Sequence, residues 1–156
     1  MNKLTISQNK TLKLINVLKH KNLFQNGNSD MSALIDQMNS YIRVNGAMQI
    51  GPLIQYLKSD IDETGKMTME CQIMLQCNHP LTHVMFPYSM ENIILVPNCM
   101  YCRYIGPKDK MNFAYDKIYL EAFEHDIKLR GDSYTIFVDE NEEEEIVTVD
   151  IFMPKE

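Results

Sequence analysis

Residues 98–110, NCMYCRYIGPKDK, decide how the second half of the chain is read. Cys99 and Cys102 stand here at C-x-x-C spacing, just before a glycine–proline turn. A zinc site needs four converging ligands, and zinc knuckles hold such a pair in a tight turn. These two cysteines instead lie in a strand-like run, where residues three apart point to opposite faces. We therefore predict a strand that leads into a helix, with structural thiols and no metal site.

The composition is that of a folded, acidic protein. The 156 residues are 45% hydrophobic and 23% charged, with a net charge of -6. Affinity for nucleic acid comes largely from clustered Lys and Arg, so we expect no direct nucleic-acid partner. No apolar run approaches the ~20 residues that span a membrane, and residues 1–21 lack the apolar core of a secretory signal. We expect a cytoplasmic protein that is not inserted in a membrane and has no cofactor.

The first half of the chain, about residues 11–77, predicts the order strand, helix, strand, strand. A leucine-rich strand over 11–20 precedes a helix whose apolar residues recur at helical spacing and which ends at Gly46. The turn DIDETG joins the last two strands. The second of these alternates cleanly, which predicts the inward-facing set Met67, Met69, Cys71, Ile73 and Leu75.

After a linker over residues 78–90, the second half (91–154) repeats this order. KLRG ends its helix at Gly131, as RVNG does at Gly46, and the closing strands TMECQIM and TVDIFMP place Glu70 and Asp150 at the same position. An internal duplication is the simplest interpretation. We predict a single α+β domain in which duplicated β-α-β-β units form an antiparallel sheet with both helices on one face.

Two segments carry a resemblance to a known superfamily. VPNCMYCRYIGPKDKMNFAYDKI (96–118) resembles the second-half signature of GyrI-like (SHS2-type) effector-binding domains. IGPLIQYL followed by MTMECQIML resembles their first-half strand pair, with Glu70 at a position that is often acidic. The resemblance covers about residues 11–154. It implies the duplicated fold. Members of the superfamily that bind cationic drugs or hydrolyse small molecules usually carry a Glu and a Tyr, two residues apart, in the third strand of the second half.

At the positions aligned with that Glu and Tyr, this chain has Thr135 and Phe137. We therefore expect no enzyme activity and no catalytic residues. Within the superfamily, the chain is similar to EsaE-like chaperones of the type VII secretion system. That similarity implies a non-enzymatic cytosolic chaperone or adaptor that binds the non-catalytic region of a secreted toxin (LXG-like or nuclease) and targets it to the secretion ATPase. The alternative is a GyrI-like protein that binds a small-molecule effector.

Candidate site residues follow from each function. A ligand pocket would use aromatic side chains with polar tips beside one carboxylate, and the candidates are Glu70, Tyr101, Tyr104, Tyr115 and Tyr134. Packing in the core is the alternative for these tyrosines. A partner interface would use exposed apolar residues of the linker, Met85 and Tyr88, or the acidic run Glu142, Glu143, Glu144 and Glu145. A solvated turn is the alternative for that run.

Overall fold

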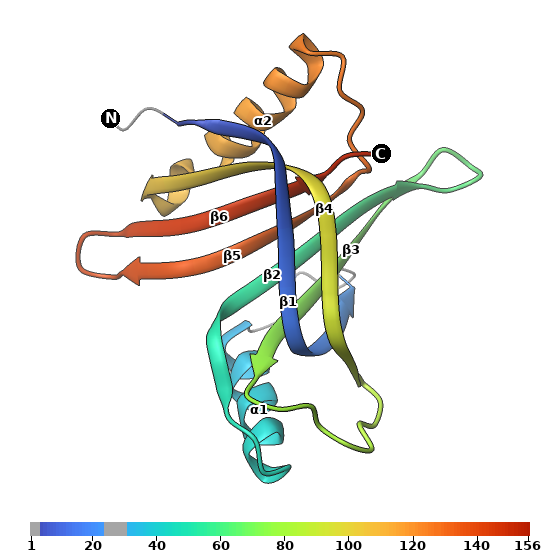
Figure 1. The fold of residues 1–156 in the computed structure, drawn as a ribbon, viewed down its shortest axis with the longest axis vertical. Coiled ribbons are helices and arrows are strands. Elements are labelled where there is room, and N and C mark those ends of the chain that lie inside the picture. The colour runs from blue at the N-terminus through green and yellow to red at the C-terminus, as the bar shows by residue number, and fades with distance from the viewer. Residues whose placement is uncertain (1–3, 24–30) are drawn as a thin grey trace. The chain divides into compact units, whose positions relative to one another are not determined.

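The computed structural model describes residues 4–23 and 31–156 and confirms the α+β class (Figure 1). The elements in chain order are β1 (Ile6–Leu23), α1 (Met31–Val44), β2 (Gln49–Ile61), β3 (Met67–Cys77), β4 (Tyr88–Pro107), the 3-10 turn η1 (Lys108–Lys110), α2 (Asn112–Glu124), β5 (Asp132–Asn141) and β6 (Ile146–Pro154). Each predicted strand and helix is present. In the part of the chain described here, neither helix has the length and apolarity needed to cross a membrane.

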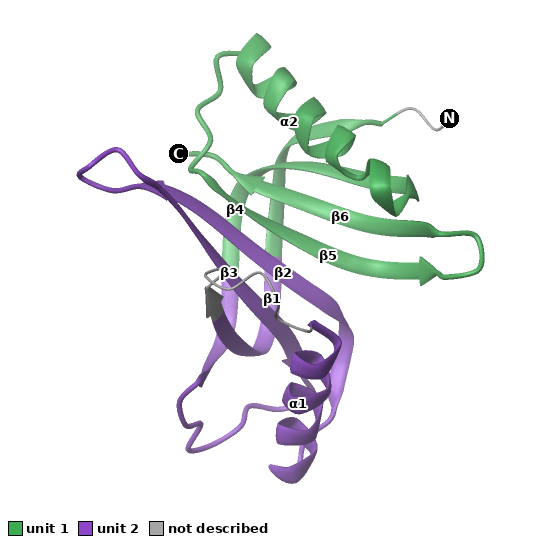
Figure 2. Cartoon of the chain, turned by 180° about the vertical axis from the view of Figure 1, so that it is seen from behind, with its two compact units in different colours: residues 1–12, 95–156 green, residues 13–94 purple. Residues whose placement is uncertain are grey.

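The chain divides into two compact units, which are described one at a time (Figure 2). Unit 1 comprises Met1–Leu12 and Leu95–Glu156, and unit 2 comprises Lys13–Ile94. The long strands β1 and β4 each contribute to both units. The predicted linker, residues 78–90, belongs to unit 2, and its last residues already form the start of β4.

Unit 2 is built on three antiparallel strands, with β3 between β1 and β2. The alternation of β3 puts every second side chain against α1, and the core there contains Leu18, Met38, Ile42, Ala47, Cys71, Ile73, Leu75, Cys77 and Leu81. The prediction that Met67 and Met69 also point into the core is wrong, since both are exposed. They lie where the β2–β3 hairpin extends beyond α1 (Figure 1), so α1 does not cover them.

Unit 1 has the same plan, with β6 between β4 and β5. Its core against α2 contains Met100, Cys102, Tyr104, Ala114, Ile118, Ala122, Val147, Val149, Ile151 and Met153. The stretch over 98–110 is indeed a strand that leads through η1 into a helix. Cys102 belongs to this core, whereas Cys99 is buried outside it, as expected for strand residues three apart.

The two helices end in the same way, although at a residue that differs from our prediction. Gly46 has φ 81°, and the amide that follows it donates to the Ile42 carbonyl at 3.1 Å. Asp126 has φ 53°, and the amide that follows it donates to the Ala122 carbonyl at 2.8 Å. This is the Schellman pattern, in which a left-handed residue closes the helix. Gly131 was predicted to match Gly46, but it lies directly before β5, and Asp126 takes the helix-ending position.

The long strands β1 and β4 each contain an Asn with a left-handed backbone. Asn16 within β1 has φ 48°, and Asn98 within β4 has φ 57°. Asn is among the few residues other than Gly that adopt this conformation readily. Equivalent strand irregularities and equivalent helix ends support an internal duplication.

Candidate ligand-binding face

The strand register of unit 1 gathers polar and aromatic side chains on the sheet face opposite α2. Tyr101 of β4 pairs with Phe152 of β6, which also pairs with Tyr134 of β5. Two residues further along β4, Arg103 pairs with Asp150. Directly opposed residues in antiparallel strands share a face. We call this surface the far face of unit 1, and its members are Tyr101, Arg103, Tyr134, Asp150 and Phe152.

Asp150 is the hydrogen-bonding centre of the far face. Arg103 donates from Nε to Oδ1 at 2.8 Å and from Nη2 to Oδ2 at 2.9 Å. The Tyr101 hydroxyl donates to Oδ1 at 2.8 Å. Burial disfavours the charged carboxylate, yet the hydrogen bonds from Arg103 and Tyr101 prevail and lower the pKa of Asp150. Asp150 is therefore an ionised carboxylate at neutral pH, with both oxygens bonded.

Two aromatic rings lie beside this ion pair. The Tyr101 and Phe152 ring centroids are 4.9 Å apart and the planes are inclined at 45°. Lys10 of β1 holds its Nζ 5.4 Å from the centre of the Tyr101 ring, within the range of a cation–π contact. Burial and the Asp150 carboxylate raise the pKa of Tyr101, so the hydroxyl stays protonated and remains a donor. The far face thus offers the partly exposed ring of Tyr101 beside charged groups, with Phe152 and Tyr134 buried next to it.

The predicted pocket tyrosines separate onto two sides of the sheet. Tyr101 and Tyr134 lie on the far face, where they flank Phe152 in one cross-strand row. Tyr104 lies in the core against α2, and its hydroxyl donates to the Pro107 carbonyl at 2.6 Å. Tyr115 of α2 shares a hydrogen bond with the Thr135 hydroxyl.

Glu70 lies in unit 2 in a setting that repeats that of Asp150. It occupies β3, and its carboxylate accepts from Lys21 of β1 at 2.8 Å. That hydrogen bond is the main reason why the pKa of Glu70 is lowered. Asp150 of β6 pairs likewise with Arg103 of β4. At this equivalent position, each unit therefore has a carboxylate held by a cation from its long strand.

The β5 positions aligned with the superfamily's Glu and Tyr are on the side of the sheet that faces α2. Thr135 pairs with Ile151, and Phe137 pairs with Val149, both members of the core against α2. The neighbouring β5 residue Tyr134, which pairs with Phe152, lies on the far face instead. A register error of one residue exchanges the two faces of a strand. The lack of a Glu and a Tyr at positions 135 and 137 therefore does not change which side chains the far face presents.

The linker residues Met85 and Tyr88 differ in accessibility. Met85 is 73% exposed and the adjacent Phe86 is 96% exposed. Tyr88 is half-buried, and its ring centroid lies 4.5 Å from that of Tyr41 and 5.5 Å from that of His20. Tyr88 therefore packs within unit 2, while Met85 and Phe86 are available at the surface.

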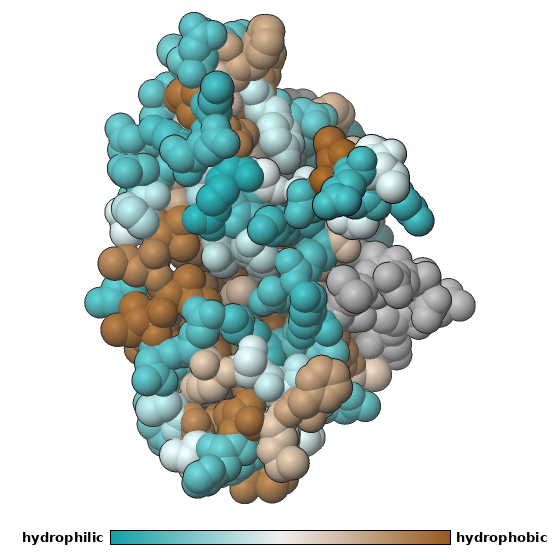
Figure 3. Space-filling view, turned by 90° about the vertical axis from the view of Figure 1, so that its right-hand side faces the viewer, coloured by the Kyte–Doolittle hydropathy of each residue, from teal (hydrophilic) through white to brown (hydrophobic). Residues whose placement is uncertain are grey.

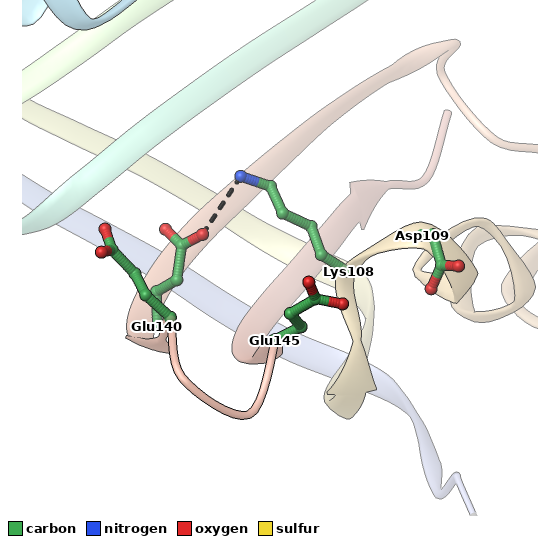
Figure 4. Close-up of a pocket in the computed structure, with 5 residues that line it drawn as sticks. Lys108, Asp109, Glu140 and Glu145 are labelled. Carbon is green, nitrogen blue, oxygen red and sulfur yellow. Dashed lines mark hydrogen bonds and ion pairs between the residues drawn. The ribbon is translucent and has the colours of Figure 1, made fainter.

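The acidic run is exposed and occupies the turn between β5 and β6. A hollow there is lined by Lys108, Asp109, Glu140, Glu142 and Glu145 (Figure 4). Lys108 reaches Glu140 at 3.2 Å, as the dashed line marks. Both partners are about half exposed, and exposed pairs of this kind contribute little to stability. The hollow has no buried polar group that would hold a ligand.

Sequence reasoning missed the basic residues of the far face and the exposed side of α2. Arg103 stands two residues after Tyr101 in a strand, and this spacing alone places the two side chains on one face. On α2, four large hydrophobic side chains are exposed: Phe113, Tyr119, Leu120 and Phe123. In Figure 3, apolar side chains gather in several groups at the surface among polar ones.

The described residues contain no cluster of three or more His, Cys, Asp or Glu side chains arranged to hold a metal ion. Burial raises the pKa of Cys99 and Cys102, so both thiols favour the protonated form. Protonated thiols are poor metal ligands and poor nucleophiles.

No family model and no curated protein matches the sequence. Solved structures do match. The EcmrR–DNA complex aligns with 98% of this chain and 57% of that chain, with a TM-score of 0.71 and 14% identity. This chain therefore spans little more than half the length of EcmrR.

Two further matches cover nearly the whole of both chains. A hydrolase encoded by lin2189 from Listeria innocua aligns with 96% of this chain and 92% of that one, with a TM-score of 0.59 and 10% identity. SAV2435 bound to tetraphenylphosphonium aligns with 96% and 94%, with a TM-score of 0.54 and 8% identity. At such low identity these likenesses establish the fold, and they agree with the fold expected from the GyrI-like resemblance.

Proposed function

We propose that this protein is a GyrI-like small-molecule-binding domain of the cytoplasm, and that the far face of unit 1 contacts the ligand. The observation that carries the proposal is the Tyr101–Phe152 ring pair beside the Arg103–Asp150 ion pair. Aromatic side chains beside a few precisely placed polar groups are typical of small-molecule sites. The fold likeness to SAV2435, solved with an organic ion, supports the same class of function.

Tyr101 is the residue through which the proposal is best tested. Tyr101→Ala removes one ring and one donor to Asp150, whereas Tyr119→Ala removes an exposed ring from α2 and serves as the matched control. Both variants should be titrated calorimetrically with tetraphenylphosphonium, naphthalene-2-methanol and naphthalene-2-sulfonate.

We expect at least one probe to bind the wild type, with about tenfold weaker binding to Tyr101→Ala and unchanged binding to Tyr119→Ala. Equal loss in both variants would place the ligand elsewhere. No measurable binding of any probe to the wild type would count against the proposed function itself.

The chaperone function remains the second candidate, because α2 exposes a set of apolar residues. Phe113, Leu120 and Phe123 recur at helical spacing on the side away from the core. Exposed apolar patches often mark protein-binding surfaces. If the chain delivers a secreted toxin, Phe113→Ser combined with Phe123→Ser should abolish co-purification of the toxin and leave naphthalene binding intact. Retention of the toxin by this double variant would remove α2 from consideration.

We also retain the expectation that the chain is not an enzyme. The two buried thiols of β4 and the fully bonded Asp150 offer no activated nucleophile or free base. Because a hydrolase shares the fold, a screen with chromogenic esters is the direct test, and turnover lost in Asp150→Asn would overturn this expectation.

A further inference from the structure

The carboxylate of the far face is already neutralised by the protein's own cation. Oδ1 of Asp150 accepts from both Tyr101 and Arg103, and Oδ2 accepts from Arg103. A paired arginine and carboxylate in this two-point geometry form a strong, directional interaction. A cationic ligand that approaches Asp150 would have to displace Arg103 first.

The Tyr101 ring also has a cation of the protein beside it. Lys10 holds its ammonium group 5.4 Å from the centre of the Tyr101 ring. The same positive charge acts on Asp150. The negative face of the Tyr101 ring, which would attract a ligand cation, is therefore already approached by a lysine.

Exposure decides which charge an incoming molecule meets. The Arg103 side chain is 50% exposed, whereas that of Asp150 is 14% exposed. Lys10 is exposed as well. The charges of Lys10 and Arg103 against that of Asp150 leave one net positive charge here, although the whole chain carries -6.

Unit 2 repeats this order of exposure. The Lys21 side chain is 61% exposed, and that of its partner Glu70 is 27% exposed. Lys58 pairs in register with Glu70 from the other neighbouring strand and adds a further cation. The arrangement of an outer cation over an inner carboxylate is thus a property of both repeats.

We infer that the ligand of the far face is an aromatic organic anion, whose ring contacts Tyr101 and whose anionic group pairs with Arg103 and Lys10. This inference rests on the proposed function and specifies its ligand class. It separates this chain from SAV2435, whose solved complex contains the cation tetraphenylphosphonium.

A charge-matched pair of probes tests the inference. Naphthalene-2-sulfonate and naphthalen-2-ylmethylammonium share one ring system and differ in the sign of the charge. Calorimetric titration at low salt should show the sulfonate binding about tenfold more tightly to the wild type. Lys10→Met and Arg103→Met should each weaken sulfonate binding about fivefold. Lys128→Met, which removes one exposed charge elsewhere in unit 1, should leave it unchanged.

The outcomes are distinguishable. Tighter binding of the ammonium probe would overturn the inferred ligand class and leave the proposed function standing. Equal weakening by Lys128→Met and Lys10→Met would show non-specific attraction and would also overturn the inference. If neither naphthalene probe bound while tetraphenylphosphonium did, the ligand class would again be wrong. If no probe bound at all, the proposed function would fail with it.

Discussion

The helix ends provide a quantitative test of the internal duplication. Gly46 closes α1 with φ 81°, and a Cβ built there meets no atom within 4 Å. Because no clash contributes, Gly46→Ala costs only the backbone strain of a left-handed alanine, about 1 kcal/mol. For a chain of this length, that corresponds to a fall of about 2–4 °C in Tm.

At the equivalent position of α2, Asp126 has φ 53° and is exposed. Asp tolerates this conformation better than Ala, so Asp126→Ala should cost about 0.5 kcal/mol, and Asp126→Gly should stay within about 0.5 kcal/mol of the wild type. Asp116→Ala, an exposed change within α2, serves as the control. Urea unfolding followed by circular dichroism at 222 nm measures all four variants. A neutral Gly46→Ala, or a loss of more than about 1 kcal/mol in Asp126→Gly, would refute the assignment of these residues as equivalent helix caps.

Three further predictions follow from charge and burial. The pKa of Asp150 is lowered in the folded state, so the ionised carboxylate stabilises the fold above the ordinary carboxyl pKa, and this contribution is lost as the pH falls through the lowered value. The free energy of unfolding, measured from pH 2 to 6, should fall accordingly toward low pH. Arg103→Met should make this pH-dependent fall smaller. The buried thiols of Cys71, Cys77, Cys99 and Cys102 should react slowly with Ellman's reagent in the native protein and rapidly in urea, and elemental analysis should find no stoichiometric zinc. Replacing Glu142, Glu143, Glu144 and Glu145 by Gln should change the Tm by less than about 2 °C, since all four are exposed; a larger fall would show that the turn stabilises the fold.

Local patterns predicted the elements because each pattern matched the burial that the fold imposes. The alternation of β3 placed Cys71, Ile73 and Leu75 correctly, since α1 covers that stretch. The same alternation failed at Met67 and Met69, where the β2–β3 hairpin extends beyond α1. Periodicity identifies which residues share a face, but only the length of the covering element determines where burial stops.

The helix end of the second half was mispredicted for a related reason. Glycine is the commonest residue in the left-handed position, so Gly131 was favoured over Asp126. Asp also adopts this conformation, and the hydrogen bond from the following amide to Ala122 decides the position. Strand alternation alone separates Tyr101 from Tyr104, which stand three residues apart in β4. The predicted site was incomplete for a third reason, because the pairing of β4 with β6 brings Arg103 beside Asp150. Such pairing between strands distant in sequence leaves no local signal.

The central claim, that the far face of unit 1 contacts a small molecule, is tested most directly by nuclear magnetic resonance on protein with 13C-labelled tyrosine rings. Titration with naphthalene-2-sulfonate should shift the ring signals of Tyr101 and Tyr134, which share a row on that face. The signals of Tyr41 and Tyr88, which pack against each other in unit 2, should stay in place. Shifts confined to Tyr41 and Tyr88, or saturable binding that leaves Tyr101 unmoved, would contradict the claim.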